Sequence, residues 1–176
     1  MTRAAALVAM VGGLAGACTA TGVDDQWYSI GYNLGDLAYA ADHRDLRVEV
    51  HGTPAGVPPG RFATAVAAAM PHGIGIVTHF TPTPDTSANP LYRVVWDYAP
   101  NRPYWELCTT GPEAPAAAPI GATKVAVAFC RGPSVLSYVH GAAPGAADPG
   151  DPAFEALVRA MTLELFPRHD SVHNRN

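Results

Sequence analysis

One segment, residues 124–131, constrains the fold of this chain more than any other. Large and small apolar residues alternate along it: Val125, Val127 and Phe129 are separated by Ala126, Ala128 and Cys130. A strand with two apolar faces is typical of the middle of a sheet that is covered on both sides. The sequence therefore predicts that this segment is a central strand, with further chain packed on each face.

Shorter segments with period-two alternation predict the rest of the sheet. Strands are expected at residues 46–51, 73–80 and 91–98, a returning edge strand at 104–108, and a hairpin strand at 135–140. Residues 27–34 alternate only in part, so they are either a strand or an irregular arm. Residues 35–44 are ambiguous, because their helical spacing extends over a short run only.

Two segments have the 3.6-residue period of an amphipathic helix. The first covers residues 61–70, where apolar side chains recur at helical spacing until Pro71 stops the helix. The second begins at Asp151 and Pro152, an N-cap followed by proline at the first helical position. Pro167 ends it. Its apolar stripe consists of Phe154, Leu157, Val158, Met161 and Leu165.

Together these elements predict an α+β fold. We expect a single two-layer sandwich at residues 26–167, with a mostly antiparallel sheet of about five strands and two amphipathic helices. The 17 prolines and 17 glycines fall mostly between the periodic segments, which favours long loops over disorder. Residues 168–176 are polar and are expected to be a frayed tail.

The amino terminus has the pattern of an export signal. Arg3 gives a short positive region, and residues 4–14 are eleven uncharged apolar or glycine residues. Such a run fits a signal sequence and is shorter than the roughly 20 residues of a membrane span. We therefore expect residues 1–17 to be a signal peptide and residues 18–25 to be a tether.

The end of this signal, residues 14–18, resembles the bacterial lipobox. In that family the cysteine, here Cys18, receives diacylglycerol and becomes the new amino terminus; the usual leucine three positions earlier is Ala15 here. An ordinary signal-peptidase site ending at Ala17 stays open as the alternative. By resemblance to enterobacterial lipoproteins, Thr19 in place of aspartate favours the outer membrane, facing the periplasm.

The count of cysteines supports the lipobox. If Cys18 carries lipid, Cys108 and Cys130 remain as a pair in an oxidising compartment, where a disulfide is expected. If Cys18 is not acylated, an exported protein keeps an odd thiol. We therefore predict lipid attachment at Cys18 and a disulfide between the other two cysteines.

The charge and the histidines exclude several classes of function. With 15 acidic and 11 basic residues the net charge is −4, which gives no electrostatic case for binding nucleic acid. No GxSxG, HExxH or Cys/His cluster occurs, so we predict no catalytic residue, metal or cofactor. Three histidines near strand ends could nevertheless converge: His51, His79 and His140.

The best candidate for binding is the loop at residues 98–105. Prolines stiffen it, and its large side chains suit a flat contact surface for a protein, glycan or lipid. We expect that surface to contain Tyr98, Arg102, Tyr104 and Trp105. The alternative is that Tyr98 and Trp105 cap the hydrophobic core at a hairpin end. Residues 27–39 form a second aromatic-rich stretch with the same two interpretations.

These observations predict a lipid-anchored, non-enzymatic protein of the bacterial envelope. It would bind an envelope protein partner and act as an adaptor or structural partner in an envelope assembly or transport complex. The order of the elements over residues 45–166 looks like that of several small lipoproteins that assist outer-membrane assembly and transport. The alternative is a periplasmic or secreted soluble protein. It would bind a small ligand or metal, or act as an enzyme, through the histidines or the loop at residues 98–105.

Overall fold

The computed structural model describes residues 22–71, 73–98, 102–109, 124–142 and 148–168. Within them the chain forms one mixed sheet of six strands in the order β1-β6-β5-β4-β2-β3, together with three α-helices and a short 3-10 helix. The predicted α+β class is confirmed, with one more strand and one more α-helix than expected. Cys18 and the predicted signal peptide lie outside the described residues.

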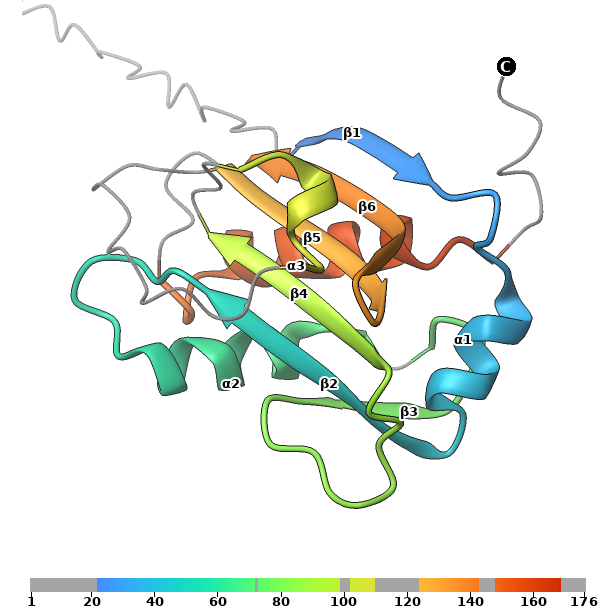
Figure 1. The fold of residues 1–176 in the computed structure, drawn as a ribbon. Helices are drawn as coiled ribbons and strands as arrows, with labels where there is room; N and C mark the ends of the chain where they lie inside the picture. Colours follow the sequence, from blue (N-terminus) through green and yellow to red (C-terminus); the bar gives the residue numbers. More distant parts are fainter. Residues whose placement is uncertain (1–21, 72, 99–101, 110–123, 143–147, 169–176) are drawn as a thin grey trace, which may run out of the picture.

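The elements have the following bounds (Figure 1). The strands are β1 Gly22–Tyr28, β2 Arg44–His51, β3 Thr78–Thr81, β4 Tyr92–Tyr98, β5 Lys124–Arg131 and β6 Ser134–Ala142. The helices are α1 Leu34–Ala41, α2 Pro59–Ala69, α3 Pro152–Leu165 and the 3-10 helix η1 Tyr104–Glu106.

The sheet combines antiparallel and parallel pairing. β1, β6, β5 and β4 are successive antiparallel neighbours, whereas β2 pairs parallel with both β4 and β3. The parallel pair β2 and β3 is joined through α2, as parallel strands require a crossover. The predicted hairpin is confirmed: β5 and β6 meet across Gly132 and Pro133, and Gly132 adopts a φ of 54°.

The main hydrophobic core lies between the sheet and the α-helices, on what we call the helix face. It contains the large residues of β5, Val125, Val127 and Phe129, packed against the apolar stripes of α2 and α3. The predicted start of α3 is confirmed, since the Asp151 side chain accepts a hydrogen bond of 2.8 Å from the Ala153 amide. Figure 1 shows α2 and α3 behind the sheet.

The opposite face, which we call the strap face, is covered by a different element. Residues 102–109, the strap, cross it and include η1, in front of β5 in Figure 1. The small residues of β5 make room for this segment, and Leu107 and Cys108 pack into a second apolar cluster with Val95 of β4. The strap therefore packs on the second apolar face of β5, and the prediction that both faces of this strand are covered is confirmed.

The strap corrects one sequence prediction. An edge strand was expected at residues 104–108, but Tyr104–Glu106 is a 3-10 helix that lies over the sheet. The disulfide explains the difference, because Cys130 belongs to β5, which already has β4 and β6 as neighbours. A cysteine bonded to it must lie above the sheet and cannot join an edge.

Two further boundaries differ from the sequence prediction. β3 is only Thr78–Thr81, where a strand was expected from residue 73, because Gly73 and Gly75 have φ angles of 148° and 101° and interrupt an extended run. β1 begins at Gly22, inside the segment expected to be a tether. The ambiguous residues after it form α1, whose N-cap Asn33 accepts a hydrogen bond of 2.8 Å from the Asp36 amide.

Candidate binding surface

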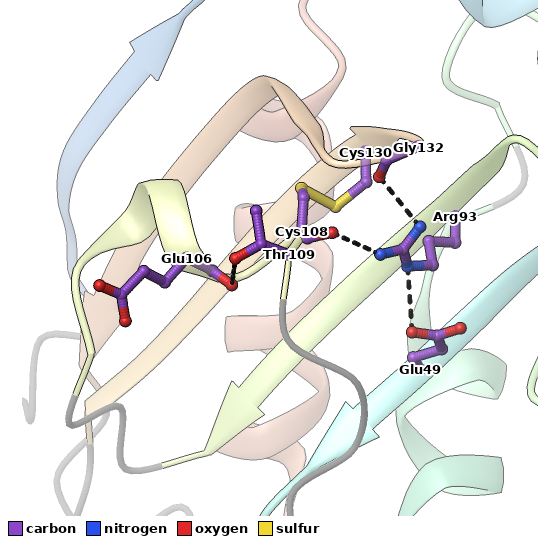
Figure 2. The surroundings of a disulfide bond; sticks show 7 residues. All are labelled: Glu49, Arg93, Glu106, Cys108, Thr109, Cys130 and Gly132. Atoms are coloured by element: carbon purple, nitrogen blue, oxygen red, sulfur yellow. Dashed lines mark hydrogen bonds and ion pairs between the residues drawn. A yellow bond between two sulfur atoms is a disulfide. The ribbon is translucent and has the colours of Figure 1, made fainter.

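The strap is fixed to the sheet at its carboxyl end by a disulfide and an arginine (Figure 2). Cys108 and Cys130 are bonded, as predicted, with their Cα atoms 5.6 Å apart. Arg93 of β4 donates from Nη2 to the Cys108 carbonyl oxygen (2.7 Å) and from Nη1 to the Gly132 carbonyl oxygen (3.1 Å). Its Nε forms an ion pair with Glu49 of β2 at 3.1 Å. The disulfide alone is worth about 3 kcal/mol through loop closure.

The strap's amino end is fixed by a second ion pair. Arg102 donates from Nε to Oδ2 of Asp97 at 2.8 Å, and the two side chains are only 9% and 7% exposed. Nη2 of Arg102 also lies 3.5 Å from Nδ1 of His51. Because both charges are withdrawn from water, each depends on the other for compensation. This pair therefore sets where the strap begins to cross the sheet.

His51 lies at the bottom of this arrangement, at the end of β2. It is 4% exposed, and its Nε2 has no hydrogen-bond partner within the described part of the chain. Burial lowers the pKa of His51, the nearby Arg102 guanidinium lowers it further, and the carboxylates of Asp97 and Glu49 oppose them; Arg93 adds a smaller lowering effect. The imidazole is therefore neutral at pH 7, and its Nδ1 can accept a hydrogen bond from Nη2 of Arg102.

Four aromatic side chains form a cluster that we call the aromatic patch. Two of them belong to the strap and two to the sheet beside it: Tyr104 and Trp105, and Trp27 and Tyr138. Tyr104 is the centre, with ring centroids 5.2 Å from Trp27, 5.2 Å from Trp105 and 5.1 Å from Tyr138. Trp27 is 39% and Trp105 58% exposed, unusual values for the largest apolar side chains. The rings support one another and still present two indoles to solvent.

The sequence-predicted surface is divided between the two faces of the sheet. Tyr104 and Trp105 lie in the aromatic patch, and Arg102 is buried in its ion pair. Tyr98 lies on the helix face, where its ring contacts Phe62 edge-on at 5.4 Å. Burial raises the pKa of Tyr98. The alternative prediction, that Tyr98 and Trp105 cap the core, is confirmed for Tyr98 and wrong for Trp105, which is 58% exposed.

Two members of the patch were not expected, Trp27 and Tyr138. They face each other across the β1–β6 pairing, so that strand register alone brings them together. Trp27 belongs to the aromatic-rich stretch noted in the sequence, but nothing in the sequence indicated that β1 pairs with β6. Burial raises the pKa of Tyr138, and the negative charge of Asp25 adds to this effect. Asp25 therefore lies close to the patch.

The histidines expected to converge do not. His51 and His140 lie in one row across the strap face, through Asp97 and Ala126, and three strand spacings of about 4.8 Å separate them by roughly 14 Å. His79 is bonded to Asp45 at 3.0 Å, near the opposite end of β2. Among the residues that the structure describes, no three potential ligands are close enough to hold a metal ion.

Two hollows complete the surface. An apolar space of about 10 Å³ between α2, α3 and the sheet has room for one water molecule at most. An open polar hollow of about 370 Å³ follows the edge of β1 and is lined by Val23, Asp24, Asp25, Gln26 and Glu164.

None of the helices in the described ranges is long and apolar enough to cross a membrane. Comparisons with protein-family models, curated proteins and solved structures find no match for this chain.

Proposed function

We propose that this protein is a lipid-anchored, non-enzymatic component of the bacterial envelope that binds a protein partner through its aromatic patch. The observation that carries the proposal is the exposure of Trp27 and Trp105 on a support that is held rigid. Tryptophan and tyrosine contribute most of the binding energy at many protein interfaces. A rigid patch loses little conformational entropy when a partner docks.

The strap supplies this rigidity. Tyr104 and Trp105 lie between two fixed points, the Arg102–Asp97 ion pair and the disulfide of Cys108. Both fixed points are attached to the sheet, and the remaining rings of the patch belong to the sheet itself. A segment held only to cover the core would satisfy the same anchors without exposing the indole of Trp105 beside that of Trp27, which is why the patch supports a binding function.

The proposed anchor limits where the partner can be. If Cys18 carries lipid, four residue steps separate it from Gly22, and a chain of that length reaches at most about 14 Å. Trp27 lies five residues further along β1, a rise of roughly 17 Å. The patch is then within about 30 Å of the bilayer. The partner would be an envelope protein that is anchored in, or extends close to, the same membrane.

The experiment is site-specific photo-crosslinking in living cells. Trp105 is replaced by p-benzoylphenylalanine, with Leu163 on the exposed side of α3 as the matched control position. We expect one protein adduct from position 105 and none from position 163, and loss of the adduct in a Trp27→Ala background. Equal adducts at both positions, or none at position 105, would overturn the proposal.

One observation favours the rival function, a binding protein or enzyme for a small ligand or metal. The Nε2 atom of His51 is buried and unpartnered among the described residues, an arrangement that a ligand could satisfy. Native mass spectrometry of detergent-extracted protein tests this rival. A stoichiometric bound metal or small molecule that is lost in His51→Gln would favour it over the adaptor.

A further inference from the structure

We infer that the partner segment that docks on the aromatic patch is basic and presents arginine or lysine side chains to the two exposed indoles. This inference rests on the proposed function and specifies the chemistry of the same surface. It follows from the charges around the patch and from the register of β1.

Carboxylates adjoin the patch on its β1 side. Asp25 lies two residues before Trp27, and the register with His140 and Tyr138 places both side chains on the strap face. The effect of Asp25 on Tyr138 is consistent with this position. Asp24, at the bulge of β1, is exposed beside it, and both residues line the open polar hollow together with Glu164. The patch and the acidic edge form one continuous surface along β1.

Within the described ranges, no lysine or arginine forms an ion pair with Asp24 or Asp25. Among the described residues of β1, β5, β6 and the strap, the lysine and arginine side chains are Arg102, Lys124 and Arg131, and the one histidine is His140, which lies opposite Asp25 in the register. Arg102 is paired with Asp97, and Arg131 is paired with Asp36 at 3.4 Å. The register places Lys124 two residues, about 7 Å, along β5 from the row of Asp25, and two strand spacings, roughly 10 Å, across the sheet from β1.

A basic segment fits this surface better than the other occupants. A guanidinium or ammonium group is attracted to the face of an indole, most strongly to tryptophan, and the neighbouring carboxylates add to that attraction. Anionic lipid headgroups and acidic glycans would be repelled by Asp24 and Asp25. A neutral glycan would gain stacking but would leave the carboxylates without a cation.

The test uses the full-length protein in vesicles of neutral phosphatidylcholine. The probes are fluorescein-labelled ten-residue peptides of alternating glycine and arginine, or glycine and glutamate, followed by fluorescence anisotropy. We expect the arginine peptide to bind and the glutamate peptide and empty vesicles to give no signal. Trp27→Ala should weaken binding about tenfold. Asp24→Asn/Asp25→Asn should weaken it about two- to fivefold per carboxylate, and salt should weaken it further.

Glu155→Gln is the matched control, since it removes one exposed carboxylate from α3 and should leave binding unchanged. Equal binding of both peptides, no binding of the arginine peptide, or no effect of the double variant would overturn the inference. Binding of soluble neutral glycan fragments in place of the peptide would also overturn it. The proposed function has its own readout, the crosslinked adduct from position 105. If that adduct survives Asp24→Asn/Asp25→Asn, the protein has a protein partner but the partner segment is not basic.

Discussion

At the scale of single residues, the strap face depends on two ion pairs, one of them buried and the other partly exposed. Arg93 and Arg102 each join the strap to the sheet, and each is balanced by one carboxylate, Glu49 or Asp97. His51 lies beside the second of these pairs and is neutral at pH 7. This cluster therefore determines how stably the strap, and with it the aromatic patch, is held.

The protonation of His51 gives a pH dependence of stability. Its pKa in the folded protein lies below the ordinary value of about 6.5, so between these two values the unfolded chain binds a proton that the folded chain does not. The contribution of His51 to the free energy of unfolding should be constant above about pH 7.5. Below about pH 6.5 it should fall by at most about 1.4 kcal/mol per pH unit until the folded pKa is reached.

Urea unfolding between pH 8 and pH 5 measures this dependence. His51→Gln should remove most of the slope between pH 6.5 and 5, and His43→Asn, which replaces an exposed histidine outside this cluster, is the matched control. An identical slope in wild type and His51→Gln would show that another group is responsible.

The Arg102–Asp97 pair should be costly to break. Arg102→Met removes the guanidinium from a carboxylate that is 7% exposed, and the loss of one partner from a buried pair costs about 3–5 kcal/mol. Arg131→Met is the matched control, since its side chain is 47% exposed and its pairing with Asp36 should be worth less than about 1 kcal/mol. Chemical unfolding at pH 7 measures both, and equal losses would contradict a special role for Arg102.

At the scale of elements, β5 determines both layers. Its large residues belong to the core under the helices, and its small residues leave space that the strap fills with Leu107 and Cys108. The same alternation explains why the strap is not a strand, because one of its side chains is bonded to a central strand from above. The large residues of β5 therefore pack against helices, and its small residues pack against the strap.

Filling the strap side of β5 should displace the strap. Ala128 is fully buried beneath it, and Ala128→Leu adds three carbon atoms to a packed site, which costs about 1–3 kcal/mol. We expect the emission of Trp105 to change and limited proteolysis within residues 102–109 to become faster. Ala156→Leu, on the exposed side of α3, is the control that should change neither measurement.

At the scale of the whole molecule, the sequence predicted the elements better than their neighbours in space. The central strand, the hairpin and the α3 cap were evident because period, turn residues and caps are local signals. The pairing of β1 with β6 was not, since it joins residues more than 100 positions apart, and it places Trp27 beside Tyr138. The aromatic patch was therefore only half predicted: Tyr104 and Trp105 were expected, and the two sheet residues were not.

Cysteine pairing links the folded domain to the proposed anchor. The chain has three cysteines, and the bond between Cys108 and Cys130 leaves Cys18 as the one remaining thiol. We predict that mature protein extracted from membranes with detergent begins at Cys18 and has the added mass of diacylglycerol on its amino-terminal peptide. Cys18→Ser should move the protein to the soluble fraction with its disulfide intact. A native amino terminus without lipid, or wild-type protein found only in the soluble fraction, would remove the anchor and with it the limit on where a partner can reach the aromatic patch.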